Sequence, residues 1–356
     1  MTNTAAIRHT HRNRMRTLFI HAAYVCLILA ATVASPAWTA DATQRPFSGE
    51  RIRLVVGFGV GGGYDAYARL LVPHLERETG ATVIVENWTG GGGIVALNRL
   101  SAGRSDVITL MLINGPSATL SQIIGREGVR YDLRELVWLG GIQAEKTVIM
   151  AGPRSSFRTL ADIVGADETV LWAASSVTTN AASPALISQA LNLHSRIIIG
   201  YKGSSESSLA VLGGEADLAA MSETSALQQV HKNGLVPIAV VGARSVLLPE
   251  VRTVIEQLDL SPEQARWIDF GAGVMEIGRA LAASSHISPE HAEYLRRVFE
   301  KILTDPEVTR EAAARGRPID FTPASEVKSH IRRLMNELEE PTRSELKDVI
   351  VNKHLH

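Results

Sequence analysis

From residue 51 onward, short apolar runs alternate with amphipathic segments of helical periodicity. The run at residues 51–56 predicts a buried strand, and residues 66–78 carry apolar side chains at the spacing of a helix. Pro73 predicts a kink or an early end of that helix, and Gly80 predicts its stop. Further strands are predicted at residues 82–86, 107–113, 146–151, 169–173, 195–200, 217–220 and 236–241, and further helices at 94–100 and 160–164. This alternation predicts an α/β fold with a parallel sheet and helices on both of its faces.

The C-terminal third is predicted to be mostly helical. Three pairs of a capping residue and a proline mark helix starts there, because Ser, Thr or Asp caps a helix and proline fits its first turn. These pairs are Ser288-Pro289, Asp305-Pro306 and Thr322-Pro323.

The first forty residues follow a different pattern. They contain four arginines and no acidic residue, then an apolar run from Leu18 to Ala34, then small residues up to Ala40. This order is typical of a secretory signal peptide, with cleavage expected between residues 34 and 41. The alternative is an uncleaved membrane anchor, for which the run is short against the ~20 apolar residues of a membrane span. Met1 and Met15 are both candidate start residues.

Composition and charge narrow the class of protein. The 356 residues suffice for two domains at roughly 100–200 residues each. The 36 basic and 37 acidic residues give a net charge of -1, which excludes a strongly basic nucleic-acid binder. Removing the four arginines of the signal leaves 32 basic against 37 acidic residues, a net charge of -5. The one cysteine, Cys26, also lies in the signal, which excludes an intrachain disulfide and a thiolate metal cluster. We further expect an exported monomer that holds no metal ion and no cofactor.

Two glycine-rich loops each join a predicted strand to a predicted helix. Consecutive glycines let the backbone approach a ligand, and a helix N-terminus adds partial positive charge in the same place. Because both loops follow strands of one sheet, we expect them to form an anion site at its edge. The candidate ligand-binding residues are Gly61, Gly62, Gly63, Tyr64 and Asp65 in the first loop and Asn87, Thr89, Gly91 and Gly92 in the second.

The first loop also matches a dinucleotide fingerprint, Gly57-x-Gly59-x-x-Gly62, with Glu86 ending the next strand. A nucleotide-dependent α/β enzyme is therefore an alternative. Asp65 argues against this enzyme alternative, because an acidic residue at the start of the helix repels a pyrophosphate and caps the helix amides. The export signal also delivers the chain to a compartment where nicotinamide cofactors are not expected. No Gly-x-Ser-x-Gly elbow and no histidine pair at metal-ligand spacing supports another enzyme class.

A second set of polar residues follows two later strands. Small hydroxyl groups and backbone amides precede a helix in both segments, and such groups hold a carboxylate without a buried countercharge. Lys202 would add a cation there. The candidates are Ser175, Ser176, Thr178, Thr179, Tyr201, Lys202, Gly203 and Ser204.

Five blocks in a fixed order resemble a known family, the periplasmic substrate-binding proteins of tripartite tricarboxylate transporters, or Bug receptors. The blocks are residues 61–71, Val85-Glu86-Asn87 with Gly90 to Gly93, residues 201–204, residues 212–218 and residues 247–254. The resemblance implies a two-lobed α/β fold of the type II periplasmic binding proteins, with a ligand cleft between the lobes. It implies a small carboxylate as ligand, a di- or tricarboxylate or an aromatic acid, and the membrane subunits of such a transporter as partners.

The resemblance also implies where the lobes divide. We expect the first lobe at residues 50–150 and 242–356 and the second at 151–241, with crossings near Ala151 and Val241. Met221 and Ser222 follow a strand near the expected cleft and complete the candidate ligand-binding residues. Ala220-Met221 replaces a Phe-Asp pair frequent in the family, so ligand identity does not carry over. The residues leave open whether the captured solute feeds a transporter or serves a signalling receptor.

Overall fold

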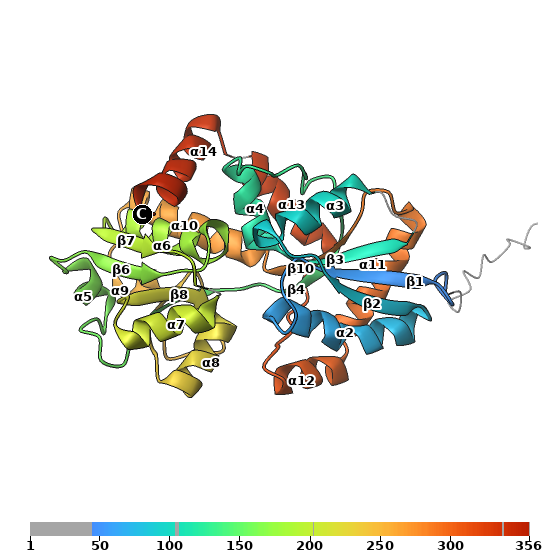
Figure 1. The fold of residues 1–356 in the computed structure, drawn as a ribbon, viewed down its shortest axis with the longest axis horizontal. Coiled ribbons are helices and arrows are strands. Elements are labelled where there is room, and N and C mark those ends of the chain that lie inside the picture. The colour runs from blue at the N-terminus through green and yellow to red at the C-terminus, as the bar shows by residue number, and fades with distance from the viewer. Residues whose placement is uncertain (1–44, 104–106, 202, 337, 356) are drawn as a thin grey trace, which may run out of the picture. The chain divides into compact units, whose positions relative to one another are not determined.

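The described residues of the computed structural model, 45–103, 107–201, 203–336 and 338–355, form two five-stranded sheets (Figure 1). The predicted signal peptide at residues 1–40 and Lys202 lie outside the described residues. The first sheet has the order β2-β1-β3-β10-β4 and the second β7-β6-β8-β5-β9. The fold is therefore an α/β fold of two lobes, as the sequence predicts.

The first sheet combines strands from both ends of the chain. Its strands are β1 (Arg51–Val56), β2 (Thr82–Asn87), β3 (Ile108–Asn114), β4 (Val137–Gln143) and β10 (Arg279–Ala283). The side chains of β1 point alternately to the two faces of the sheet. Leu54 packs with Tyr67 and Leu71 on one face, whereas Val55 packs with residues on the other. Helices α2 (Gly63–Thr79), α11 (Pro289–Leu303) and α12 (Pro306–Ala314) cover the first face, and α3 (Ile94–Ala102), α4 (Gly115–Ile123) and α13 (Ala324–Asn336) cover the second.

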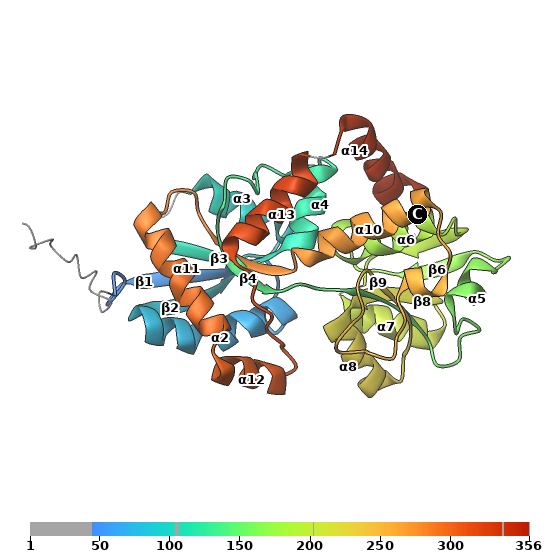
Figure 2. The same ribbon diagram turned by 180° about the vertical axis from the view of Figure 1, so that it is seen from behind.

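The second sheet is built from the middle of the chain. Its strands are β5 (Thr147–Ala151), β6 (Val170–Ala173), β7 (Ser195–Ile198), β8 (Leu218–Ser222) and β9 (Val236–Val241). Val148 and Met150 of β5 face helices α7 (Ser204–Gly213) and α8 (Glu223–Asn233), whereas Ile149 and Ala151 face the opposite side. On that opposite side lie α5 (Leu160–Val164), α6 (Ala182–Ala190), α9 (Val254–Gln257) and α10 (Pro262–Glu276). Figure 2 shows α6 and α10 on one side of this sheet and α7 and α8 on the other.

Neither sheet is purely parallel, which corrects the sequence prediction. Strand β10 runs antiparallel to both β3 and β4, and β5 runs antiparallel to both β8 and β9. Each of these strands comes directly after the chain has passed from the other sheet. Such a strand begins at the end of its sheet that is nearer to the other lobe. The neighbouring strands begin at the opposite end of the sheet, so the two directions are antiparallel.

The two crossings of the chain lie elsewhere than expected. Strand β5 already belongs to the second sheet, so the first crossing lies between Gln143 and Thr147 and not near Ala151. After β9 the chain stays beside the second sheet through α10 and returns to the first only at Arg279. The two crossing segments touch, because the Glu145 N–H donates to the Met275 carbonyl over 3.1 Å.

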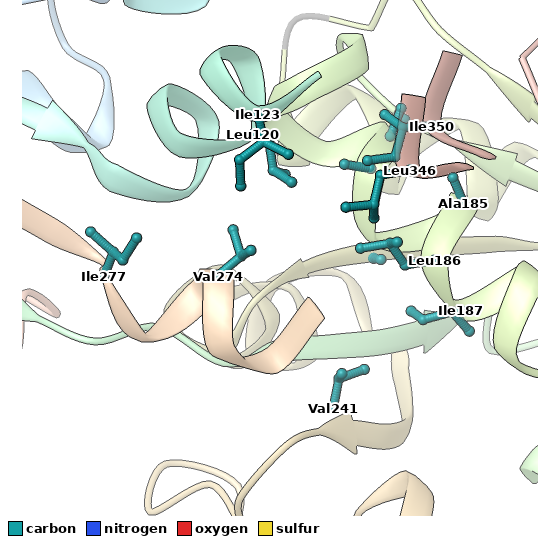
Figure 3. Packing of buried hydrophobic residues seen from close by; sticks show 14 of the residues in the cluster. Leu120, Ile123, Ala185, Leu186, Ile187, Val241, Val274, Ile277, Leu346 and Ile350 are labelled. Carbon is teal, nitrogen blue, oxygen red and sulfur yellow. The ribbon is translucent and has the colours of Figure 1, made fainter. Parts of the chain in front are cut away.

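The C-terminal end of the chain belongs to the second lobe, also contrary to expectation. After α14 (Glu340–Lys347) and η3 (Asp348–Lys353), the Ile197 N–H of β7 donates to the His354 carbonyl over 2.8 Å. Figure 3 shows Leu346 and Ile350 beside Leu186 of α6, opposite Leu120 and Ile123 of α4. Val274 of α10 lies in the same apolar cluster, which therefore runs from one sheet to the other.

Most predicted elements are confirmed within two residues, and the exceptions have local causes. Helix α2 begins three residues earlier than predicted, at Gly63, and continues through Pro73 to Thr79, so the predicted early end is wrong. The stop at Gly80 is confirmed, and Gly80 has the left-handed backbone that glycine adopts without steric cost. The caps Ser288 and Asp305 each accept a backbone N–H of the helix that follows.

Candidate ligand site

A cavity of about 630 Å³ is lined by residues of both lobes. Its wall includes residues at the N-terminal ends of four helices, namely α2, α4, α7 and α8. A helix N-terminus carries roughly half a positive charge and free backbone N–H groups. Four helix ends around one cavity make it suitable for an anion, without requiring a lysine or arginine for each negative charge. In two of them a first-turn amide already has a partner, because Asn114 Oδ1 accepts the Ser117 N–H of α4 and the Lys146 carbonyl accepts the Glu223 N–H of α8.

The first lobe supplies the loop between β1 and α2. Gly62 is the N-cap of α2, and no side chain bonds to the first helix amides. The Asp65 carboxylate instead accepts the Gly61 N–H over 2.9 Å and the Asn87 side-chain amide over 3.0 Å. Asp65 therefore holds the two glycine loops together and leaves the helix amides free, which corrects the expectation that it caps them.

Asp65 is charged at neutral pH. It is buried, and the Arg69 guanidinium at 2.9 Å, followed by the Gly61 and Asn87 bonds, lowers its pKa to about 2. A carboxyl whose pKa is lower in the folded state stabilises that state above its unfolded pKa and loses this effect as the pH falls. Asp65 therefore stabilises the loop fully at neutral pH and progressively less as the pH falls below about 4.

Asp65→Asn is expected to lower the free energy of unfolding at pH 7 by about 1–2 kcal/mol, because a charged acceptor is replaced by a neutral amide. The difference between wild type and variant should shrink from pH 7 to pH 3, because the Asp65 carboxylate of the unfolded wild-type chain takes up its proton at a higher pH than that of the folded protein. Urea unfolding at the two pH values measures both effects. A difference that is the same at both pH values would contradict the assigned charge.

The second lobe contributes hydroxyl groups. Ser175, Ser176 and Thr179 lie at the start of η2 (Val177–Ala181), and the Ser176 hydroxyl donates to Thr179 Oγ1 over 2.9 Å. Ser204 begins α7 after Gly203, and Ser222 is the N-cap of α8. These side chains give the cavity donors that can turn toward a bound oxygen atom.

The structure brings twelve of the candidate residues to the cavity wall and leaves six others off it. Gly62, Gly63, Tyr64, Gly92, Ser175, Ser176, Thr179, Tyr201, Gly203, Ser204, Met221 and Ser222 line the cavity. Gly61, Asp65, Asn87, Thr89, Gly91 and Thr178 do not. Thr178 faces α4 instead, where its Oγ1 accepts from Ser121 Oγ over 3.1 Å and from Arg126 Nη1 over 3.0 Å.

Sequence reasoning missed the two charged residues among the described residues of the wall, Glu145 and Arg279. Both are buried, at 8% and 7% exposure, and Glu145 Oε1 lies 2.5 Å from Arg279 Nη1. The guanidinium also lies over the rings of Tyr64, at 5.1 Å, and Tyr67, at 4.8 Å. Burial alone lowers the pKa of Arg279, but the Glu145 carboxylate and the two tyrosines raise it, so that Arg279 stays charged.

No group of three or more metal-ligating side chains occurs within the described residues. In the same part of the chain, no helix is long and apolar enough to cross a membrane.

Two sheets joined by two crossing segments, with a cavity between the lobes, are the architecture of the type II periplasmic binding proteins. Residues 67–277 match the family described as "Tripartite tricarboxylate transporter family receptor". The chain belongs to this family.

Curated relatives and solved structures agree with this assignment. The chain is 23% identical to Protein BugT of Bordetella pertussis over 306 residues, which cover 83% of this chain and 88% of BugT. It is 25% identical over 268 residues to a UPF0065 protein of Agrobacterium vitis, covering 72% and 75% of the two chains. The periplasmic binding protein BugD has the same fold, with a TM-score of 0.65 at 19% identity, over 86% of this chain and 99% of BugD. MatC of Rhodopseudomonas palustris, solved with bound malate, has a TM-score of 0.64 at 16% identity, over 84% and 99%.

Proposed function

We propose that the protein captures a small carboxylate in the periplasm and delivers it to the membrane subunits of a tripartite tricarboxylate transporter. The observation that carries this proposal is the cavity between the lobes, whose wall includes four helix N-terminal ends. Family membership supports it, as does the malate held by MatC. A further Rhodopseudomonas palustris protein was solved with adipate and matches with a TM-score of 0.67 at 16% identity, over 84% of this chain and 97% of that one.

The mechanism is capture between two lobes. One carboxylate of the ligand accepts hydrogen bonds from the free amides at the start of α2, at Gly63 and Tyr64. The hydroxyl groups of Ser176, Thr179 and Ser204 bind the ligand from the second lobe. Because ligand groups then join both lobes, binding favours the closed arrangement, and the membrane subunits recognise that arrangement.

The proposed function involves no chemical reaction of the ligand. The Gly57–Gly62 fingerprint lies in the loop at the cavity, where Gly59 and Gly62 line its wall. We therefore interpret this loop as part of the carboxylate site rather than as a nucleotide site, and the protein as a receptor rather than an enzyme.

Isothermal titration calorimetry on the exported chain, starting at residue 41, tests the proposal. The panel comprises malate, adipate, citrate and benzoate, with the diamide of adipate as an uncharged control. At least one carboxylate should bind with a Kd near 1 μM, about -8 kcal/mol, and the diamide should not bind. Absence of binding by every carboxylate, to protein whose circular dichroism shows it folded, would refute the proposed function.

A further inference from the structure

Thr178 does not line the cavity, although the sequence predicts that it binds the ligand. It belongs to η2 of the second lobe and is buried, at 1% exposure. Its Oγ1 atom accepts from Ser121 Oγ over 3.1 Å and from Arg126 Nη1 over 3.0 Å, and it lies 3.3 Å from Ser117 Oγ. Two of these partners lie in α4 and Arg126 closely follows that helix, so all three belong to the first lobe. Thr178 is therefore the centre of a polar contact between the lobes.

Arg126 also binds the second glycine loop. Its Nη1 donates to the Gly91 carbonyl over 3.2 Å, and the neighbouring Gly92 lines the cavity. A Cβ added at Gly92 would lie 3.7 Å from Arg126 Nη1 and 3.5 Å from Thr179 Oγ1. Thr179 follows Thr178 and lines the cavity from the second lobe. The guanidinium therefore joins the glycine loop of one lobe to the hydroxyl-bearing segment of the other, directly beside the cavity.

The polar character of this contact makes it reversible. Water can replace hydroxyl and guanidinium partners when they separate, so breaking the contact costs only the difference between the two kinds of hydrogen bond. Arg126 is half-buried and has no carboxylate partner among the described residues, so no ion pair fixes it in place. Its charge nevertheless makes its hydrogen bonds stronger than bonds between neutral groups. Such a contact can hold two lobes together and still release them.

We propose that Arg126 and Thr178 form a latch that holds the lobes closed over the bound ligand and so sets the rate of its release. This inference rests on the proposed function, in which the ligand joins the same two lobes through the amides of α2 and the hydroxyl of Thr179. Ligand and latch favour one arrangement, so each stabilises the other. The ligand enters the open arrangement, where the latch is not formed. Arg126 and Thr178 are thus positioning residues that act on dissociation and not on association.

Surface plasmon resonance on immobilised protein tests the latch, with the member of the panel of malate, adipate, citrate and benzoate that wild-type protein binds most tightly. Thr178→Val keeps the shape of the side chain and removes the hydroxyl. It should raise the dissociation rate at least tenfold and change the association rate less than twofold. Tenfold corresponds to about 1.4 kcal/mol, which the loss of a hydrogen bond from a charged donor can supply.

Arg126→Gln removes the same contact from the other lobe and should have the same effect on the dissociation rate. Because both substitutions remove one shared bond, the double variant should raise that rate by less than the product of the two single effects. Effects that simply multiply would contradict a direct contact between the two side chains.

Arg130→Gln is the matched control for the loss of charge. Arg130 follows the same helix, is exposed, and its side chain has no hydrogen bond or ion pair within the described part of the chain. A general loss of attraction for an anion would appear in both arginine variants. Arg130→Gln should leave the dissociation rate within twofold of wild type.

A disulfide tests whether the lobes part at this contact. The exported chain, residues 41–356, contains no cysteine, so Ser121→Cys combined with Thr178→Cys supplies a single pair of thiols. The two hydroxyl oxygens lie 3.1 Å apart, so sulfur atoms in their place can approach the disulfide distance. The oxidised double variant should release bound ligand at least a hundredfold more slowly than the reduced one, and dithiothreitol should restore the release.

The outcomes separate this inference from the proposed function. If folded Thr178→Val and Arg126→Gln release the ligand as slowly as wild type, or if the oxidised protein exchanges it as fast as the reduced one, the latch is wrong while the carboxylate site stands. If mass spectrometry shows that no disulfide forms, the rates of the two single variants decide. If folded wild-type protein binds no carboxylate of the panel, the proposed function itself fails.

Discussion

Gly63→Asp is expected to weaken carboxylate binding by at least a hundredfold while the protein folds normally. Gly63 is the first residue of α2 and lines the cavity. A Cβ added there would meet no atom within 4 Å, so the new side chain has room. Its carboxylate would lie at the helix end where the ligand carboxylate binds, and repulsion of about 2.7 kcal/mol suffices for the hundredfold loss.

The folded state should tolerate this substitution. An acidic residue in the first turn interacts favourably with the helix dipole, by about 0.3–1 kcal/mol. The melting temperature of Gly63→Asp should therefore equal or exceed that of Gly63→Asn, which has the same size without the charge. Calorimetry with the ligand that binds wild-type protein most tightly compares the affinities of the two variants. The comparison isolates the effect of the added negative charge on binding. Equal affinities would show that no ligand anion binds at the start of α2.

Gly278→Ala is expected to lower the free energy of unfolding by about 2–5 kcal/mol, because it combines backbone strain with a steric clash. Gly278 has a φ of +54°, in the left-handed region, and lies in the second crossing. An added Cβ would lie 1.8 Å from the Gln143 carbonyl oxygen, at the end of β4. The two crossings would have to move apart, which would also disturb the contact between Glu145 N and Met275 O.

Gly273→Ala is the control for that prediction. Gly273 lies within α10, its backbone is helical, and an added Cβ would meet nothing within 4 Å. Alanine there should leave stability unchanged or raise it by up to about 1 kcal/mol, through its higher helix propensity. Urea unfolding of both variants compares the two positions. If Gly278→Ala is as stable as Gly273→Ala, the inference that the two crossing segments are closely packed is wrong.

The sequence was informative wherever a local signal decides structure. Residues 51–56 and 236–241 are strands with the predicted bounds, because a short apolar run between turn residues has few alternatives. The first glycine loop joins strand to helix as expected, and Gly62 and Gly63 lie on the cavity wall. The early helix end predicted at Pro73 is wrong, because the rest of α2 packs on the first sheet and tertiary packing outweighs the loss of one helix hydrogen bond.

Features that depend on distant parts of the chain could not be predicted in this way. An apolar strand such as β5 has the same pattern in either sheet, so residues 147–151 did not reveal which lobe they join. Arg279 begins a strand in the first sheet, and Glu145 lies in a short link, so neither belongs to a motif. Only the fold brings them together, and a single charged residue in sequence is more often solvated than buried.

A crystal structure of the exported chain with its tightest-binding carboxylate tests the central claim most directly. We predict that the ligand lies between the two lobes, with a carboxylate oxygen within hydrogen-bond distance of a backbone N–H at the start of α2 and with at least one hydroxyl of Ser176, Thr179 or Ser204 on the ligand. A ligand bound outside this cavity, or held by one lobe alone with the amides of α2 unused, would contradict the account.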